Sequence, residues 1–313
     1  MPKKSGNGSV KRTYAFLGPV GTFTELALAQ VAEAKGQRHL PVSNVQEAID
    51  LVLAKKAQRA IIPVENSIEG GVSATLDALA ATDNVRIYGE YLVPISFNLV
   101  AAKGVSLKDV RTVATHPVAY AQTRKWLAEH LPKHRHLPAT STAAAAADLL
   151  EGSPAEAAVA AATITEHYDL KVLARNIGDN KHAQTRFIQI GLAGSVAQRT
   201  GRDKTSVIVE LPNDRPGALL EMLEQFAARG VNLSRIESRP IGDRMGRYRF
   251  NIDVEGHLHD EAVAEALKGL HRFSPRVVFL GSYARADKEQ SIHRGNNSNP
   301  EFAAAEAWLK KLR

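Results

Sequence analysis

Polar residues that directly follow an apolar run are the first candidates for chemistry in this sequence. Glu65, Asn66 and Ser67 come after the apolar run 61–64 and before a pair of glycines, and they bring together a carboxylate, an amide and a hydroxyl. Ligands of open α/β sheets bind beyond the carboxyl ends of the strands, so this stretch is typical of a binding loop. A purely structural turn has a similar composition and stays open as the alternative.

A second candidate lies where a long polar loop ends and an apolar run begins, at Thr185, Arg186 and Phe187. The threonine hydroxyl can donate a hydrogen bond, and the guanidinium can pair with a carboxylate through two parallel hydrogen bonds. An ordinary strand start explains the same three residues, and their spacing alone does not choose between the two interpretations.

Two expected helix starts add further polar groups. Thr22 is followed three residues later by a glutamate, which predicts a capping box, and Gly21 lets the backbone approach a neighbour closely. Such a turn can bind a carboxylate or can simply cap the helix. Ser141 and Thr142 open an alanine-rich helix and are typical of an N-cap. His116 stands before a proline in a similar arrangement, and we interpret it as structural.

The elements that must position these residues alternate between short apolar runs and helical stretches over residues 14–192, which predicts an α/β architecture with a largely parallel sheet. The expected strands are Tyr14–Leu17, Arg59–Val64, Val85–Tyr91, Ile95–Ala101, Thr112–Ala114, Ala157–Ala160 and Arg186–Ile190. The expected helices are Thr22–Ala34, Asn44–Ala54, Ser73–Leu79, Pro117–Leu131, Thr142–Leu150 and Thr163–His167.

A second domain follows a polar linker at 193–203. Its predicted order is βαββαβ, which is ferredoxin-like. The expected elements are Ser206–Leu211, Pro216–Arg229, Val231–Ser238, Arg247–Glu255, Asp260–Leu270 and Arg276–Leu280, with a turn at 242–246. In the third strand Tyr248, Phe250, Ile252 and Val254 alternate with Arg249, Asn251 and Asp253, which predicts one buried and one exposed face. Residues 282–313 are expected to form a tail with a short terminal helix, and residues 1–13 a basic flexible leader.

Length and composition limit the number of domains and the classes of partner and site that the protein can have. The 313 residues predict two domains. The net charge of +7 comes mainly from the two ends, because residues 13–281 hold 30 basic and 29 acidic side chains, so we expect no nucleic-acid partner. The absence of cysteine excludes disulfides, zinc-thiolate sites, iron–sulfur clusters and a thiol nucleophile. No apolar run approaches the roughly 18 residues of a membrane span. We therefore expect a cytoplasmic protein without a membrane partner. The sequence contains no cofactor-binding or metal-binding motif, so we expect neither a cofactor nor a metal ion.

Six ordered stretches carry a family resemblance. They are Y-A-F-L-G-P-V-G-T-F-T-E (14–25), I-P-V-E-N-S-I-E-G-G-V (62–72), S-T-A-A-A-A-A (141–147), T-R-F (185–187), G-A-L-L (217–220) and E-S-R-P (237–240). The first four resemble prephenate dehydratase, and the last two resemble the phenylalanine-binding motifs of the ACT domain fused to that enzyme. The resemblance implies a catalytic domain at 14–192 with two lobes like those of a periplasmic binding protein, a linker at 193–203 and an ACT regulatory domain at 204–281. The implied lobes are 14–90 with 186–191, and 91–180.

The resemblance also implies an activity, the decarboxylating dehydration of prephenate to phenylpyruvate in L-phenylalanine biosynthesis, without a cofactor or metal. The catalytic residues that it implies are Thr185, Arg186, Phe187 and Glu65. The implied substrate-binding residues are Thr22, Asn66, Ser67, Ser141 and Thr142. The sequence departs from many relatives at Thr115, where serine is frequent, and at Thr123, where cysteine is frequent.

Regulation by L-phenylalanine as an allosteric inhibitor follows from the same resemblance, with a homodimer or homotetramer formed through the ACT and catalytic domains. The implied effector residues are Gly217, Ala218, Leu219, Leu220, Glu237, Ser238, Arg239 and Pro240. Two alternatives stay open: an arogenate dehydratase, which performs the same chemistry on the amino-acid analogue, and a non-catalytic amino-acid sensor. A fusion with chorismate mutase is not expected, because residues 1–13 are too few for that helical domain.

Overall fold

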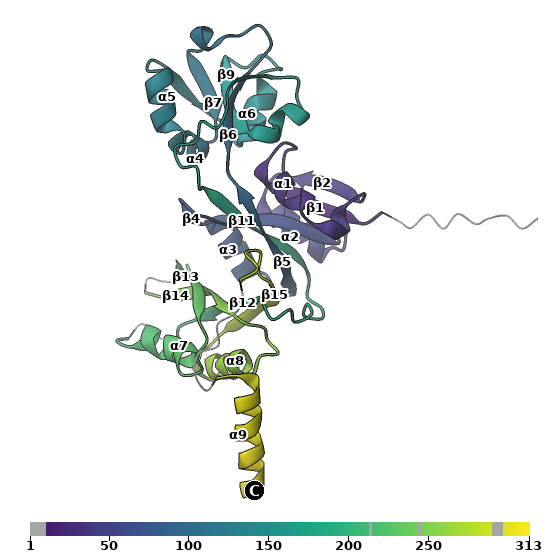
Figure 1. Cartoon of the computed structure of the whole chain (residues 1–313), viewed down its shortest axis with the longest axis vertical. Helices are drawn as coiled ribbons and strands as arrows, with labels where there is room; N and C mark the ends of the chain where they lie inside the picture. Colours follow the sequence, from purple (N-terminus) through teal and green to yellow (C-terminus); the bar gives the residue numbers. More distant parts are fainter. Residues whose placement is uncertain (1–10, 213–214, 243–245, 290–296) are drawn as a thin grey trace, which may run out of the picture. The chain divides into compact units, whose positions relative to one another are not determined.

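The computed structural model describes residues 11–212, 215–242, 246–289 and 297–313 (Figure 1). The chain forms two compact units. Unit 1 consists of Met1–Gly70 and Leu92–Phe187, and unit 2 consists of Gly71–Tyr91 and Ile188–Arg313. The chain therefore passes between the units three times. Of the leader expected at 1–13, the first ten residues lie outside the described residues, and Thr13 already belongs to the first strand.

The first sheet has the strand order β2-β1-β3-β11-β5, with the short β4 paired to β3. β1 is parallel to both β2 and β3. The strands are β1 (Thr13–Leu17), β2 (Arg38–Val42), β3 (Arg59–Asn66), β4 (Gly70–Gly71), β5 (Val85–Pro94) and β11 (Gln184–Leu192). The helices α1 (Phe23–Ala29) and α2 (Val45–Leu53) bury residues such as Leu28 and Ile49, and β1 and β3 bury Phe16 and Ile61.

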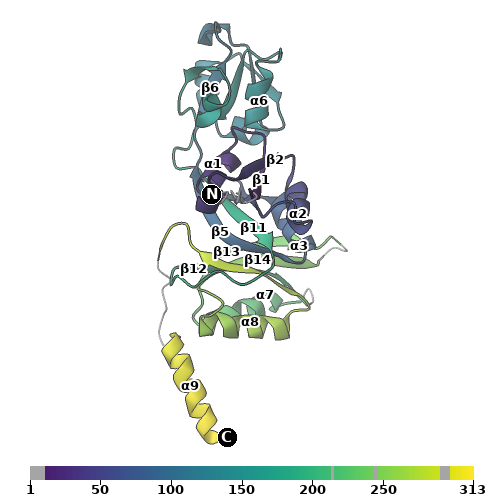
Figure 2. The ribbon, with the colours of Figure 1, turned by 90° about the vertical axis from the view of Figure 1, so that its right-hand side faces the viewer.

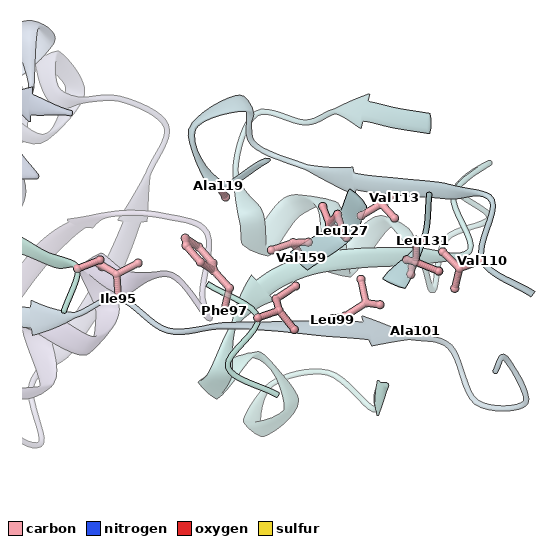
Figure 3. Packing of buried hydrophobic residues seen from close by; sticks show 13 residues of the cluster. Ile95, Phe97, Leu99, Ala101, Val110, Val113, Ala119, Leu127, Leu131 and Val159 are labelled. Carbon is pink, nitrogen blue, oxygen red and sulfur yellow. The ribbon is translucent and has the colours of Figure 1, made fainter. Parts of the chain in front are cut away.

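The second sheet lies in unit 1 and has the order β10-β6-β9-β7-β8. Its strands and helices are β6 (Phe97–Ala101), β7 (Thr112–Thr115), β8 (Arg135–Pro138), β9 (Ala157–Ala161), β10 (Lys171–Ala174), α4 (Pro117–Ala121), α5 (Arg124–His130) and α6 (Thr142–Asp148). A buried cluster that includes Leu99, Val113, Leu127 and Val159 holds it together (Figure 3). β7 is parallel to β8 and β9, but β6 is antiparallel to β9 and β10, so the predicted largely parallel arrangement is wrong for this half of the sheet.

Other differences from the expected elements have local causes. The strands β2, β8 and β10 were not predicted, because each lies at a sheet edge and lacks a continuous buried run. The predicted helix 117–131 is interrupted after α4, where the Thr123 hydroxyl donates to the Ala119 carbonyl at 2.9 Å. The Asp179 carboxylate then accepts the backbone N–H groups of Lys125 and Trp126, which starts α5 as a separate helix.

Unit 2 contains an antiparallel sheet of order β13-β14-β12-β15, with α7 and α8 on one face (Figure 2). The elements are β12 (Asp203–Glu210), α7 (Ala218–Ala227), β13 (Leu233–Pro240), β14 (Tyr248–Glu255), α8 (Glu261–Phe273) and β15 (Val277–Ala284), which confirms the βαββαβ order. The core includes Met222, Phe226, Ile252 and Leu270. The terminal helix α9 spans Asn299–Leu312. Most of the turn expected at 242–246 lies outside the described residues. None of the described helices is long and apolar enough to cross a membrane.

The predicted exposure of alternate residues on β14 is wrong. Asn251 and Asp253 are buried, at 3% and 4% exposure. Residues 71–91 of the same unit pack against this sheet. The helix α3 (Ser73–Ala81) places Asp77 against Arg249. The strand β15 lies so close to β5 that a Cβ at Gly281 would fall 2.4 Å from the Ile87 carbonyl oxygen. Sequence alternation within β14 carries no information about this distant segment.

Candidate active site

Unit 1 contains a pocket of about 260 Å³, which is lined by its residues from the first sheet and from the second sheet. Leu17, Pro63 and Asn66 line it from the first sheet, and Phe97 and Ala119 line it from the second sheet and the helix that follows β7. Six of the nine predicted catalytic and substrate-binding residues line this pocket: Thr22, Asn66, Ser141, Thr142, Thr185 and Phe187. The structure therefore brings together residues that are far apart in the sequence.

The centre of the site is the contact between Thr185 and Asn66. The Asn66 Nδ2 donates to the Thr185 Oγ1 at 3.0 Å, and the Thr185 residue is 8% exposed. The Asn66 Oδ1 accepts the backbone N–H groups of Ile68 at 2.8 Å and Glu69 at 3.2 Å, so its NH2 group is the end that faces Thr185. Because the Thr185 oxygen already accepts a hydrogen bond, its own proton is available for a ligand oxygen.

Three predicted residues, Glu65, Ser67 and Arg186, do not line the pocket. The Ser67 Oγ accepts the backbone N–H of Gln184 at 3.0 Å, while the Ser67 N–H donates to the Gln184 carbonyl at 2.9 Å. Arg186 pairs with Glu65, with 3.4 Å between Nη1 and Oε2. These contacts tie the loop after β3 to the start of β11 and so fix the positions of Asn66 and Thr185.

At the start of α1, Thr22 is both a cap and a pocket residue. Its hydroxyl donates to the Leu17 carbonyl at 3.2 Å and accepts the Glu25 N–H at 3.4 Å. The Glu25 carboxylate accepts the N–H of Gly21 at 2.6 Å, one residue earlier than a standard capping box. Gly21, with φ +80°, packs against the Ile164 side chain, so its small size serves the packing of the chain on itself.

At α6, the Ser141 Oγ accepts the Ala144 N–H at 2.9 Å, which is the N-cap expected from the sequence. Ser141 and Thr142 also line the pocket. Capping uses a lone pair of the Ser141 hydroxyl and leaves its proton available for a ligand.

Sequence reasoning missed four polar residues of the pocket: Thr24, His116, Gln122 and Thr140. His116 is the N-cap of α4, and burial lowers the pKa of its imidazole. Gln122 is 6% exposed, and its Oε1 has no hydrogen-bond partner among the described residues. His116 follows β7 directly, as Asn66 ends β3, so its place at the end of a strand was a usable signal.

The described residues that line the pocket include no aspartate, glutamate, lysine or arginine. In the part of the chain that the structure describes, no group of three or more histidine, aspartate or glutamate side chains is placed to hold a metal ion. The polar groups of the pocket are hydroxyls, amides and one imidazole, which bind through hydrogen bonds.

The eight predicted effector residues occupy two parts of unit 2. Gly217, with φ +83°, begins α7, and the space where its Cβ would lie is open. Ala218 is buried, whereas Leu219 and Leu220 are exposed, the latter by 60%. On β13, Ser238 and Pro240 are exposed, whereas Glu237 and Arg239 contact residues 71–91.

A pocket lined from the ends of two α/β sheets, followed by a βαββαβ module, defines an α/β enzyme for a small organic substrate with an appended regulatory-type domain. The family model for prephenate dehydratase matches residues 14–194, and the model for the ACT domain matches residues 205–272. The chain belongs to the prephenate dehydratase family.

Individual relatives agree with this membership. A prephenate dehydratase of Mycolicibacterium gilvum is 43% identical, over 96% of this chain and 97% of that protein. The crystal structure of an Arthrobacter aurescens prephenate dehydratase in complex with L-Phe has 53% identity and a TM-score of 0.91, and the match covers 96% of this chain and 99% of that chain. GqqA, described as a novel type of quorum quenching acylase, has 31% identity and a TM-score of 0.78, with coverage of 89% and 100%.

Proposed function

We propose that this protein is a prephenate dehydratase, which converts prephenate to phenylpyruvate. The observation that carries the proposal is the Thr185 hydroxyl, held by Asn66 inside a pocket without charged side chains. Family membership supports the same conclusion. The finer expectation of a cytoplasmic enzyme that forms a dimer or tetramer belongs to this proposal, and cell fractionation and sedimentation test it.

The reaction requires little chemistry from the protein. Prephenate has two carboxylates and a ring hydroxyl. When the bond to the ring carboxylate breaks, its electron pair makes the ring aromatic and expels the hydroxyl as hydroxide, while the carboxylate leaves as CO2. Since aromatisation drives this step, the enzyme needs to orient the substrate and to stabilise the departing oxygen. In our proposal the Thr185 O–H donates its hydrogen bond to that oxygen.

The uncharged pocket suits this reaction. The ring carboxylate loses its negative charge as CO2 forms, so a cation held against it would stabilise the substrate more than the transition state. Arg186, the predicted cation, is paired with Glu65 instead of lining the pocket. We propose that the hydroxyls of Ser141 and Thr142 donate hydrogen bonds to substrate oxygens. Thr22 lines the same pocket, but its hydroxyl already donates to the Leu17 carbonyl, so we propose that it shapes the pocket wall. Arg186 and Glu65 act by positioning the loop and the strand.

The direct test is phenylpyruvate formation from prephenate by the purified protein, with and without L-phenylalanine. We expect turnover that L-phenylalanine suppresses. Turnover on arogenate alone would replace prephenate with its amino-acid analogue as the substrate. Binding of L-phenylalanine without turnover on either compound would contradict the enzyme proposal and favour a sensor.

For feedback control, we propose that L-phenylalanine binds the ACT domain near Gly217 and that α3 receives the signal. The Asp77 carboxylate of α3 accepts hydrogen bonds from Arg239 at 2.7 Å and from Arg249 at 2.6 Å. The hydrogen bond from Arg239, with that from Arg249, keeps the pKa of Asp77 below its usual range. Arg239 belongs to the predicted effector motif, so one residue of that motif is tied to the helix that follows the Asn66 loop.

A second contact lies at the beginning of the same segment. A Cβ placed on Gly71 would lie 1.9 Å from a carboxylate oxygen of Glu237, so only glycine fits here without a shift of the Glu237 side chain. Gly71 follows Asn66 by five residues along the chain. A shift of β13 when the effector binds would therefore act on Gly71, shortly after the Asn66 loop, and on Asp77 within α3.

We expect Asp77→Asn to raise the L-phenylalanine concentration needed for half-inhibition by about 5- to 150-fold, the range of an ordinary allosteric coupling, with basal turnover unchanged. The substitution removes the charge that holds both guanidiniums. Asp83→Asn is the matched control, because Asp83 pairs with Arg276 in the same unit but its side chain is 82% exposed. Equal inhibition curves for both variants would contradict the role of α3.

A further inference from the structure

His116 is the one titratable side chain among the described residues that line the pocket. It lies between β7 and α4, directly before Pro117. His116 caps the start of α4, because its Nδ1 accepts the backbone N–H of Val118 at 3.2 Å. The same residue therefore holds the start of a helix and faces the space in which the substrate is proposed to react.

The capping bond determines which ring nitrogen carries the proton. A nitrogen that accepts a hydrogen bond from an N–H group cannot carry a proton itself, so the neutral imidazole has its proton on Nε2. Protonation of Nδ1 would place two donors against each other. Burial lowers the pKa of His116, with no charged neighbour contributing to the shift, which also favours the neutral ring at pH 7.

The His116 Nε2–H has no hydrogen-bond partner among the described residues, so it is available to a ligand. Neutral imidazoles next to the start of a helix act as hydrogen-bond donors to developing oxygen charge in other enzymes. In the proposed reaction negative charge develops at the ring oxygen that leaves as hydroxide. A threonine hydroxyl alone is a weak donor for that charge, so a second donor at the same oxygen would contribute in the transition state and little in the ground state.

We propose that His116 is a further catalytic residue, whose neutral imidazole donates a hydrogen bond from Nε2 to the departing hydroxyl oxygen of the substrate. This inference rests on the proposed dehydratase function. The imidazole does not transfer a proton to the substrate: the hydroxide leaves with the electron pair of the broken carbon–oxygen bond, and a proton supplied by the buffered solution converts it to water.

Two substitutions separate catalysis from capping. Asparagine keeps an acceptor near the position of Nδ1 and is a good N-cap, but it has no donor at the position of Nε2. Glutamine places an amide donor near Nε2 and lacks the capping acceptor. We expect His116→Asn to keep the wild-type unfolding temperature within a few degrees and to lose about 10²-fold in kcat with little change in KM, the typical effect of removing one such donor. His116→Gln should retain more kcat although it is the less stable variant.

The pH profile gives an independent readout. Since the neutral ring is the active form, kcat should stay constant from pH 8 downward and fall only when the pH drops below the lowered pKa of His116. A kcat that rises as the pH falls through 6.5 would identify a protonated general acid and overturn the neutral-donor assignment. His116→Asn with at least half of wild-type kcat would overturn the catalytic role. An inactive wild-type enzyme would instead refute the dehydratase function itself.

Discussion

Thr185→Val is expected to lower kcat for prephenate by about 10²–10⁴-fold, the range in which a positioned proton-transfer or donor group contributes. Valine keeps the shape of threonine but removes the hydroxyl that accepts from Asn66 at 3.0 Å and, in our proposal, donates to the departing oxygen. KM should change much less, because the donor acts mainly on charge that develops in the transition state. Initial rates of phenylpyruvate formation over a range of prephenate concentrations measure both constants.

Thr185→Ser is the matched control for this substitution. Serine restores the hydroxyl in a smaller side chain, so it should recover most of the lost turnover. Thermal unfolding shows whether each variant keeps its fold, and the valine variant should lose only about 1–3 kcal/mol from the Asn66 amide left without its partner. Valine and serine variants with the same kcat would contradict the hydroxyl's role.

The second large effect concerns the free energy of unfolding. Lys204→Met is expected to lower it by about 3–5 kcal/mol, because the buried Glu90 carboxylate would lose its cation. The Lys204 Nζ lies 3.0 and 2.9 Å from the two Glu90 oxygens, and the side chains are 10% and 2% exposed. Glu90 is the second-last residue of the 71–91 segment and Lys204 is the second residue of β12, so this pair joins two parts of unit 2. Urea unfolding followed by circular dichroism measures the loss.

Lys103→Met provides the comparison for the buried pair. Lys103 pairs with Asp169 at the surface, where the two side chains are 71% and 77% exposed, and such pairs contribute less than about 1 kcal/mol. The double variant Glu90→Gln with Lys204→Met should regain much of the lost stability, since no unpaired charge then stays buried. Equal losses for Lys103→Met and Lys204→Met would show that burial of the Glu90 pair has no special effect.

Sequence reasoning located residues that follow a simple geometric rule. Asn66, Thr185 and Ser141 were selected because they lie at strand ends or helix starts, and the structure places all three on one pocket. His116 follows the same rule, but the sequence analysis interprets it as a structural residue only. The reason is that a position directly before a proline at a helix start already accounts for a polar side chain. Polar side chains that cap helices can thus also belong to a binding site.

Non-local packing accounts for the remaining errors. Asn251 and Asp253 alternate with apolar residues as in a half-exposed strand, yet both are buried because residues 71–91 cover their face of the sheet. The edge strand β2 contains Pro41 and only one buried residue, so no alternating pattern marks it. Such features depend on which distant segment meets each surface, and local sequence patterns do not contain that information.

The division of the chain also matters to anyone who wishes to make this enzyme insensitive to its effector. Residues 71–91 fall inside the stretch that matches the dehydratase family, but they pack in one compact unit with the ACT sheet. A stop codon placed after residue 194 would leave Asp77 without its arginines, Glu90 without Lys204 and Ile87 without β15. Truncation would thus produce a damaged catalytic fragment, and deregulated strains are better built by single substitutions than by removal of the regulatory module.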